Sequence, residues 1–577
     1  MNPMFLRRKV ISMIEATYRN WINQPDLEDS LRQELETMTE EAKQDAFYRS
    51  LEFGTGGMRG VIGAGINRMN IYTIRKANYG FGSYLRDKWN DDVTRGVVIA
   101  HDNRHMSVAF ARESASVLAT FGIKTYLFDA LRPTPELSFA VRHLNAIGGI
   151  VITASHNPPK YNGYKIYDED GCQLVPALAD QVIARVDAVD DIFAIPTIRY
   201  DDCVEQGFVQ TIGAAIDDAY LAMVDTVQLR PDVKKTLDIV FTPLHGTSAT
   251  IGVRALEQNG FHVIPVTEQM VADPDFSTVK SPNPENKEAF EYAIRYGKEH
   301  QADILIATDP DADRLGVAVW HDGEYKLLTG NQTGAIMVDY ILRTRQEQGT
   351  LPQHGMVYNT IVTSDLGAVI AKSFGMNVKS TLTGFKFIGE QAKRIEDTDT
   401  EFLFGYEESY GYVVKDFVRD KDSIQALLLI SEIANLGKQS GKTLWDYLMF
   451  VYEQYGYYVE DLVNIVLEGQ VGEQKIQAIL AHFRDHKPNR LGESAVVAVE
   501  DYLIGERYEG DHNQPLDLPP SNVLKFFLAD GSWFVLRPSG TEPKLKIYIG
   551  VTADSLAAAR TRNQQIKDQV QAIIDTI

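Results

Sequence analysis

The feature that most constrains the fold is an arrangement that occurs three times along the chain. In each copy a short apolar, β-branched run precedes an amphipathic helical stretch, which a glycine closes before a second apolar run. A helix that ends on glycine and leads into a strand is typical of a βαβ unit. The sequence therefore predicts three related α/β domains. The copies begin at GVVIA (96–100), DIVFT (238–242) and MVYNT (356–360), and their closing glycines are Gly122, Gly260 and Gly375.

The two ends of the chain follow other patterns. Near the C-terminus, two strand-like runs flank Asp530-Gly531, a strong hairpin signal, and a further strand and an amphipathic helix follow. This order indicates an α+β cap. The first forty-odd residues are polar and favour a helical arm ahead of the first core. The predicted fold class is α/β, with mixed sheets in three related domains and a C-terminal α+β cap, divided as 1–205, 206–322, 323–455 and 456–577.

Composition narrows the class of protein. A chain of 577 residues suits several domains better than one core. A net charge of −22 disfavours general binding to nucleic acid or membrane surfaces, but it leaves room for a local basic pocket. Two cysteines, Cys172 and Cys203, are too few for a disulfide scaffold and are expected to be packed residues. No apolar run approaches the length of a membrane span, so the chain is predicted to be cytoplasmic.

The first polar motif follows an apolar strand at 150–153 and contains Ser155 and His156. Open α/β sheets bind ligands beyond the carboxyl ends of their strands. Ser155 could cap a helix, but the adjacent Pro158 and Pro159 favour an extended or turn backbone instead. The motif therefore predicts an exposed, candidate nucleophilic hydroxyl beside a histidine.

The second motif places three carboxylates directly after the strand at 304–307: Asp309, Asp311 and Asp313. Alternate residues of an extended backbone point the same way, so a divalent cation is their natural neutraliser. The spacing does not fit an EF-hand loop, and an oxygen-only site suits Mg²⁺. A solvated acidic turn is the alternative. Arg314, which follows directly, is a candidate for substrate binding.

Two further motifs carry polar side chains between predicted strands. Arg537 offers a bidentate fork for phosphate, and Ser539 and Thr541 add short-range donors, although a generic turn has a similar composition. Glu407 and Ser409 suit hydrogen bonds to sugar hydroxyls, or they form a charged turn.

Two other segments are weaker candidates. The glycine loop at 54–60, which contains Arg59, matches no nucleotide-binding fingerprint, so nucleotide binding is unsupported. The charged run at 419–422 has no role that the sequence assigns.

Taken in order, T-A-S-H-N-P, D-P-D-A-D-R, the Glu407 loop and R-P-S-G-T resemble the motifs of the α-D-phosphohexomutase superfamily. The resemblance is to its phosphoglucomutase branch, which also includes phosphopentomutases, and it covers nearly the whole chain. It implies four domains around a central cleft. One departure is Tyr406, which stands where many relatives have glycine before the glutamate and which bears on the choice of sugar.

The resemblance also implies roles for individual residues. Ser155 carries the phosphate, Arg59, His156 and Lys165 face the active site, and either His156 or Lys165 is the acid–base group. The implied metal ligands for Mg²⁺ are Ser155, Asp309, Asp311 and Asp313. The implied substrate-binding residues are Arg314, Glu407, Ser409, Arg537, Ser539, Gly540 and Thr541.

The implied reaction interconverts glucose 1-phosphate and glucose 6-phosphate, with glucose 1,6-bisphosphate as intermediate and activator. The partners are then small-molecule sugar phosphates, not nucleic acid or membrane, and the sequence does not indicate an oligomeric state. A phosphopentomutase acting on ribose or deoxyribose 1-phosphate is the first alternative. A phosphomannomutase, a serine- and metal-dependent sugar phosphatase and a non-catalytic binding protein are the others.

Overall fold

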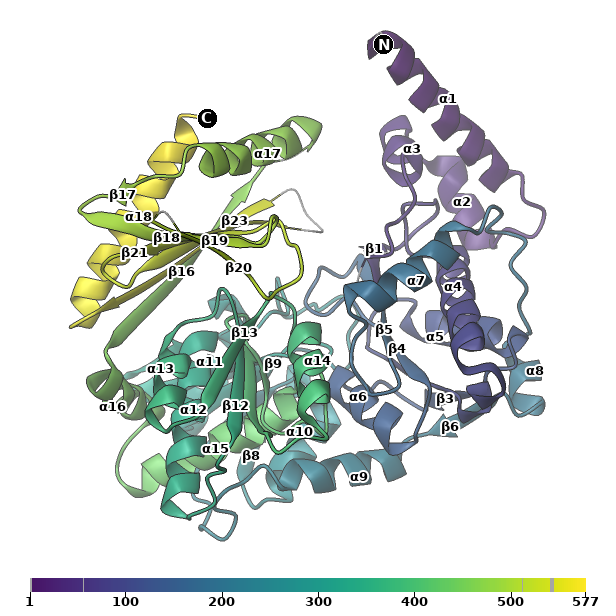
Figure 1. Ribbon diagram of the computed structural model, residues 1–577. Coiled ribbons are helices and arrows are strands. Elements are labelled where there is room, and N and C mark those ends of the chain that lie inside the picture. The colour runs from purple at the N-terminus through teal and green to yellow at the C-terminus, as the bar shows by residue number, and fades with distance from the viewer. Residues whose placement is uncertain (1–2, 55–56, 468, 511, 540–543) are drawn as a thin grey trace. The chain divides into compact units, whose positions relative to one another are not determined.

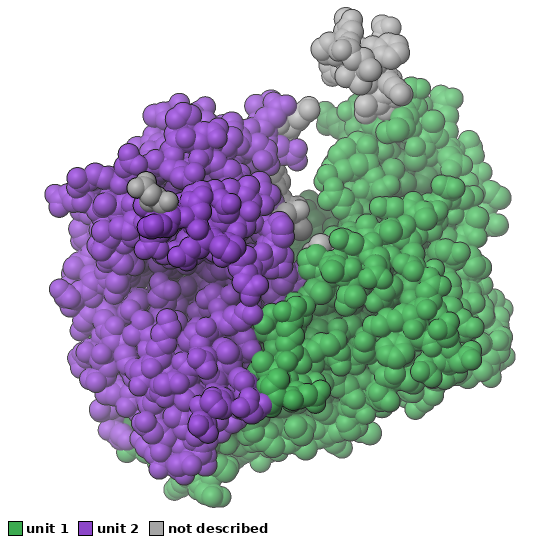
Figure 2. Space-filling model, in the orientation of Figure 1, with its two compact units in different colours: residues 1–327, 388–398, 411–439 green, residues 328–387, 399–410, 440–577 purple. Residues whose placement is uncertain are grey.

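The computed structural model describes residues 3–54, 57–467, 469–510, 512–539 and 544–577. The chain forms two compact units, coloured separately in Figure 2, and each unit is assembled from separate stretches of sequence. Residues far apart in the chain therefore share a unit. Unit 1 comprises residues 1–327, 388–398 and 411–439, and unit 2 comprises residues 328–387, 399–410 and 440–577.

The first sheet of unit 1 has six strands in the order β1-β5-β4-β2-β3-β6 (Figure 1). Strands β4, β2, β3 and β6 are parallel, whereas β5 runs antiparallel to β4 and β1. The strands are β1 (Gly57–Val61), β2 (Val97–His101), β3 (Thr125–Phe128), β4 (Gly148–Ile152), β5 (Tyr161–Tyr167) and β6 (Val209–Ile212). The accompanying helices are α4 (Ile71–Trp89), α5 (Ser107–Thr120), α6 (Thr134–His143), α7 (Pro176–Asp187) and α8 (Tyr200–Glu205), with the 3₁₀ turn η1 (Asn90–Arg95).

The second sheet of unit 1 has the order β11-β10-β9-β7-β8. Strand β7 pairs in parallel with β8 and β9, and β10 returns antiparallel to β9. The strands are β7 (Asp238–Thr242), β8 (His262–Pro265), β9 (Ile304–Thr308), β10 (Leu315–His321) and β11 (Glu324–Leu328). The other elements are α9 (Ala214–Asp225), α10 (Ser248–Glu257), η2 (Thr267–Gln269), η3 (Lys287–Phe290), α11 (Glu291–His300), β15 (Gly411–Val413) and α15 (Ser423–Gln439).

Unit 2 begins with a parallel arrangement in which β12 (Gly355–Thr360) lies between β13 (Asn377–Thr381) and β14 (Glu401–Glu407). Its helices here are α12 (Gly330–Glu347), α13 (Leu366–Ser373) and α16 (Leu444–Tyr455), and α14 (Phe385–Ile395) begins in unit 2. This part of unit 2 has the same strand–helix–strand construction as the two sheets of unit 1.

The remainder of unit 2 is an antiparallel sheet in the order β16-β23-β22-β21-β18-β19-β20, with β17 beside β18 (Figure 1). Helices α17 (Gly469–Asp485) and α18 (Leu556–Asp575) contribute Phe483 and Ile566 to the core of this sheet. The strands are β16 (Tyr457–Val466), β17 (Arg490–Leu491), β18 (Ser494–Asp501), β19 (Glu506–Glu509), β20 (His512–Pro515), β21 (Leu524–Leu528), β22 (Trp533–Pro538) and β23 (Lys544–Ala553).

The three repeated copies are confirmed as β2–α5–β3, β7–α10–β8 and β12–α13–β13, and in each the two strands are parallel. The glycines that close the helices have φ angles of 72°, 82° and 76°, the left-handed conformation that ends helices. The C-terminal hairpin around Gly531 is confirmed as β21–β22. The predicted fold class is therefore confirmed. The domain boundaries at 205, 322 and 455 and the central cleft stay predictions.

The N-terminal segment is more than a single arm. It forms three helices, α1 (Pro3–Ile22), α2 (Asp29–Thr37) and α3 (Glu40–Phe47). Trp21, 1% exposed, packs edge-on against Phe47, against Tyr72 of α4 and against Phe193. These apolar positions give the segment a small core of its own, which binds it to unit 1.

The expectation for the cysteines is confirmed, since Cys172 and Cys203 are both free and buried. Among the described residues, no helix combines the length and apolar character that crossing a membrane requires.

Candidate active site

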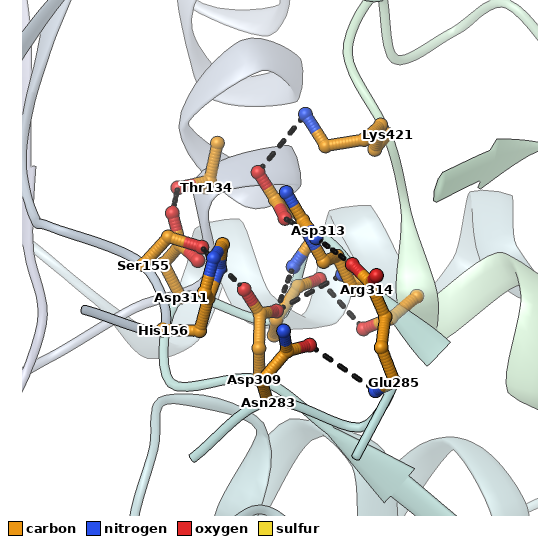
Figure 3. Close-up of polar contacts among 12 residues, drawn as sticks. Thr134, Ser155, His156, Asn283, Glu285, Asp309, Asp311, Asp313, Arg314 and Lys421 are labelled. Atoms are coloured by element: carbon orange, nitrogen blue, oxygen red, sulfur yellow. Dashed lines mark hydrogen bonds and ion pairs between the residues drawn. The ribbon is translucent and has the colours of Figure 1, made fainter. Parts of the chain in front are cut away.

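Ser155 lies just beyond the end of β4, in a loop that holds its hydroxyl against a carboxylate. Its Oγ donates a hydrogen bond of 2.6 Å to Asp309 Oδ2 and lies 3.1 Å from His156 Nδ1 (Figure 3). Its φ angle of 50° is in the left-handed region, which is costly for a residue with a side chain and is typical of functional sites. The prediction of an exposed hydroxyl was wrong: Ser155 is 3% exposed, because the side chain faces Asp309 and not solvent.

The three aspartates that follow β9 converge as predicted. Asp309, Asp311 and Asp313 are buried, and one carboxylate oxygen from each lies within 4.8 Å of the others. The loop turns at Ala312, which has a φ of 56°, and Asp309 Oδ1 accepts hydrogen bonds from the main-chain N–H groups of Asp313 and Arg314. The prediction that these side chains share one side of the loop is confirmed.

Two lysines neutralise part of this charge. Lys165 on β5 lies 2.8 Å from Asp311 Oδ2 and 3.4 Å from Asp313 Oδ2. Lys421, between β15 and α15, lies 3.1 Å from Asp313 Oδ2 (Figure 3). The charged run at 419–422, which contains Lys421, has no role that its sequence assigns. The sequence signal that could have pointed to Lys421 is the charge of the three neighbouring aspartates, which calls for more than one nearby cation.

The electrostatics of the cluster favour a further cation. Burial, with the nearby carboxylates of Asp311 and Asp313, raises the pKa of Asp309 well above its usual value. Burial acts to raise the pKa of Asp311, but the Lys165 ammonium, a hydrogen bond with Asp309 and the Lys421 cation together outweigh it and hold the pKa below its usual value. The buried Oδ1 atoms of Asp311 and Asp313 accept no hydrogen bond from any described residue. Hard oxygen donors of this kind fit a divalent cation such as Mg²⁺.

The remaining predicted residues of this part of the site surround Ser155. Burial, together with the Arg314 and Arg59 cations, holds the pKa of His156 well below its usual value, which favours the neutral ring. Arg59, on β1, is exposed and donates a 2.8 Å hydrogen bond to Asn157 Oδ1. Arg314 forms an ion pair with Glu285. The structure therefore brings Arg59, His156 and Arg314 together around the loop at 153–160, called here the serine loop because it contains Ser155.

The predicted sugar-binding residues lie in unit 2, at the end of β14. Glu407 Oε1 accepts a 2.7 Å hydrogen bond from the Gly384 main chain. Its neighbour Glu408 accepts hydrogen bonds from the hydroxyls of Thr360 and Thr363. Burial and the adjacent Glu407 carboxylate raise the pKa of Glu408 to about 7. A main-chain N–H after β13 therefore holds Glu407, whereas two threonine hydroxyls at the end of β12 and just after it hold Glu408.

Tyr406, the departure from the family pattern, is a packing residue. Its ring is fully buried and lies against two glycines of neighbouring helices, Gly334 and Gly367. A Cβ atom at Gly334 would lie 2.3 Å from the ring, and one at Gly367 would lie 2.1 Å from the phenolic oxygen. The ring therefore occupies space that these glycines leave open. Ser409, half-buried, follows in the turn after β14.

The predicted phosphate-binding loop also lies in unit 2. Arg537, on β22, donates a 3.3 Å hydrogen bond to the Tyr548 hydroxyl. Its positive charge also opposes the effect of burial on Glu408: burial raises the pKa of that carboxyl and Arg537 lowers it. Ser539 donates its main-chain N–H to the Lys544 carbonyl oxygen. Arg537 thus lies in the electrostatic neighbourhood of the glutamate loop. Gly540 and Thr541 lie outside the described residues.

Lys386 is a candidate functional residue that the sequence did not indicate. This lysine lies at the start of α14, two residues after Gly384, whose main chain holds Glu407. Burial lowers the pKa of Lys386 to about 8, so the side chain can exchange a proton near neutral pH. A basic residue in the first turn of a helix carries no distinctive pattern, which is why the sequence alone did not indicate it.

Comparison with known proteins decides the family. Models of the four phosphoglucomutase/phosphomannomutase domains, three α/β/α domains and the C-terminal domain, match residues 50–192, 218–323, 329–455 and 462–567. The chain belongs to this family. It is 38% identical to a phosphoglucomutase of Staphylococcus haemolyticus over 542 residues, and this alignment covers 93% of this chain and 96% of the relative. It is also 38% identical to a phosphoglucomutase of Staphylococcus aureus over 538 residues, 92% of this chain and 95% of the relative.

A solved structure supports the fold of this phosphoglucomutase/phosphomannomutase family member. Parafusin from Paramecium, a protein named as a phosphoglucomutase and solved in an open form, superposes with a TM-score of 0.67 at 18% identity, covering 92% of this chain and 95% of that one. At that identity the likeness concerns the fold alone. Family membership makes the chain a phosphohexomutase, which is an isomerase that moves a phosphoryl group within its substrate.

Proposed function

We propose that this phosphohexomutase is a phosphoglucomutase that interconverts glucose 1-phosphate and glucose 6-phosphate through a phosphoserine enzyme and glucose 1,6-bisphosphate. The observation that carries the proposal is the hydrogen bond from the Ser155 hydroxyl into the cluster of three buried aspartates. A hydroxyl beside hard oxygen ligands suits phosphoryl transfer, in which catalysis rests on positioning and charge stabilisation. The names of the relatives at 38% identity favour glucose as the sugar.

In the proposed reaction the phosphorylated Ser155 gives its phosphoryl group to the free hydroxyl of a hexose monophosphate. The bond from Ser155 Oγ to phosphorus breaks while a bond from the sugar oxygen to phosphorus forms, and the sugar hydroxyl loses its proton. The product, glucose 1,6-bisphosphate, then returns its other phosphoryl group to Ser155 by the reverse step. Mg²⁺ bound by Asp309, Asp311, Asp313 and the serine phosphate would polarise the phosphorus and offset negative charge.

Two sets of contacts support a choice between His156 and Lys165 as the proton acceptor. Lys165 is engaged by two carboxylates, which keep its ammonium charged. His156 Nδ1 lies 3.1 Å from Ser155 Oγ, within the range of proton exchange at the reacting oxygens. We therefore assign proton transfer to His156 and charge balance to Lys165. Arg59 and Arg314 are assigned to the phosphate oxygens near Ser155.

The residues of unit 2 supply the other contacts in this proposal. Glu407 and Ser409 bind sugar hydroxyls in this proposal, because a carboxylate and a hydroxyl beside the end of β14 are suitable hydrogen-bond partners for them. Arg537, with Ser539, Gly540 and Thr541, binds the phosphate that is not reacting. Lys386 joins the set as a second group that can exchange a proton.

The experiment is ³¹P NMR of the protein with glucose 1-phosphate, Mg²⁺ and a trace of glucose 1,6-bisphosphate. We expect the C1 phosphate signal to convert into a C6 phosphate signal without release of inorganic phosphate. Accumulating inorganic phosphate would instead identify a phosphatase. No conversion of glucose 1-phosphate, together with conversion of ribose 1-phosphate, would identify a phosphopentomutase. Ser155→Ala should abolish turnover while the circular dichroism spectrum stays that of the wild type.

A further inference from the structure

A buried arginine outside the predicted site donates hydrogen bonds to the main chain of the serine loop. Arg104 lies between β2 and α5, and none of its side chain is exposed. Its guanidinium donates hydrogen bonds to four main-chain carbonyl oxygens: those of Ser155 (2.6 Å), Asn157, Pro158 (2.9 Å) and Tyr161 (3.0 Å). One side chain therefore binds three carbonyls of the loop between β4 and β5 and a fourth at the first residue of β5.

The guanidinium is itself fixed in place. Arg104 Nε lies 3.3 Å from Asp102 Oδ2, and the main-chain N–H of Arg104 donates to Asp102 Oδ1. Asp102 Oδ1 also accepts a hydrogen bond from the Ser107 hydroxyl, at the first residue of α5. On another side, the ring of Phe276 lies 5.0 Å from the guanidinium carbon. The Arg104 guanidinium is thus oriented by the buried Asp102 carboxylate and covered by the Phe276 ring.

The loop needs such a support for a physical reason. Ser155 has a left-handed backbone conformation, which costs about 1–3 kcal/mol for a residue other than glycine and persists only where the surroundings fix it. Two consecutive prolines follow, and they provide no N–H donors with which the loop could bond to itself. A guanidinium presents five N–H donors in a rigid plane, whereas a lysine ammonium presents three from a single point.

We propose that Arg104 is a positioning residue for phosphoryl transfer: by holding four carbonyls of residues 155–161 it keeps Ser155 Oγ directed at the aspartate cluster. The inference rests on the proposed function, since it concerns the rate at which Ser155 exchanges its phosphoryl group. It goes beyond a role in folding, because the loop could remain packed without Arg104 while Ser155 Oγ moved away from Asp309. A displacement of about 1 Å at a reacting atom can lower a rate about 100-fold.

The test compares Arg104→Lys with the wild type in a single-turnover reaction with glucose 1,6-bisphosphate and Mg²⁺. Mass spectrometry gives both the fraction of protein that becomes phosphorylated on Ser155 and the rate constant of its phosphorylation. We expect the phosphorylated fraction at the end point to match that of the wild type, and the rate constant to fall about 100-fold. A residue that served folding alone would lower the fraction and leave the rate constant of the folded molecules unchanged.

Arg343→Lys is the matched control. Arg343 of α12 also donates two hydrogen bonds to a buried carboxylate, that of Asp339, but it lies in unit 2 and has no hydrogen bond or ion pair with any described residue of the proposed site. We expect its rate constant to stay within about threefold of the wild type. Asp102→Asn keeps the shape of the anchor and removes its charge, so an intermediate rate is expected, and this variant serves if Arg104→Lys does not fold.

Hydrogen exchange separates this inference from the proposed function. In Arg104→Lys, peptides that cover residues 153–163 should exchange about tenfold faster than in the wild type, with the rest of unit 1 unchanged, whether or not the protein is a mutase. If the wild type fails to convert glucose 1-phosphate, the proposed function fails. If the wild type is active but Arg104→Lys keeps its rate constant, or if its loop exchanges as in the wild type, Arg104 does not position Ser155.

Discussion

Replacing Lys421 by methionine tests whether the aspartate cluster depends on cations from distant parts of the chain. Lys421 Nζ lies 3.1 Å from Asp313 Oδ2, and both side chains are largely buried. Coulomb's law with an effective dielectric constant of about 20 gives an attraction of about 5 kcal/mol at this distance. Breaking a buried ion pair from one side costs about 3–5 kcal/mol. Because Lys165 also lies near Asp313, we expect a loss near the lower end, about 3 kcal/mol.

The assay is native-state hydrogen exchange of peptides from β9 and β10, which reports the free energy of opening at the cluster itself. Without divalent cations, Lys421→Met should lose about 3 kcal/mol there. Saturating Mg²⁺ should restore most of the loss, because a bound divalent cation replaces the missing positive charge. The gain in stability on adding Mg²⁺ should therefore be larger in the variant than in the wild type.

Lys438→Met is the control. Lys438 lies 2.7 Å from Asp303, but about a third of each side chain is exposed, so the pair is worth at most about 1 kcal/mol. Its loss should not depend on Mg²⁺. Equal losses in the two variants, or an equal stabilisation of Lys421→Met and wild type by Mg²⁺, would refute the reasoning that this cluster is balanced by Lys421.

Three further predictions follow from burial and packing. The pKa of Lys386 is about 8 in the folded protein, below its ordinary 10.5, so wild-type stability should rise with pH across that window; urea unfolding of Lys386→Met should lack this rise, while its turnover falls. Trp21→Ala should lower the free energy of unfolding by about 3–5 kcal/mol with wild-type turnover at low temperature, and reduced turnover of the folded variant would contradict the separation of the N-terminal core from the site. Gly334→Ala should cost about 1–3 kcal/mol because its Cβ meets the Tyr406 ring, and a double-mutant cycle with Tyr406→Gly should show that the two costs are not additive.

The parts of the fold that the sequence predicted are those set by local patterns. The apolar runs, the helical periodicity and the closing glycines at 122, 260 and 375 act over fewer than about forty residues, the span of a βαβ unit. The three aspartates were also predictable as a set, because they lie within five residues of one another directly after an apolar strand. The same holds for the C-terminal hairpin at Gly531.

The parts that the sequence did not predict depend on contacts between distant segments. Lys421 reaches Asp313, and Arg104 reaches the Ser155 loop, from positions that only the folded chain brings near. The sequence around Lys421 or Arg104 does not distinguish either residue from an ordinary charged residue at the surface. The burial of Ser155 was misjudged for the same reason, since the Asp309 carboxylate that covers its hydroxyl lies 154 positions away.

The discontinuity of unit 1 has a consequence for the modularity of this enzyme. Residues 1–327 include the serine loop, the three aspartates and Lys165, yet Lys421 belongs to the stretch 411–439, which joins unit 1 only after the chain has left it. During synthesis Lys421 is therefore added later than the three aspartates and Lys165. A fragment that ended before residue 411 would carry every predicted metal ligand without the charge balance of the whole protein. An exchange of residues 1–327 alone would leave Lys421 behind, because the charged residues of the proposed phosphoryl site come from three separate stretches of the chain.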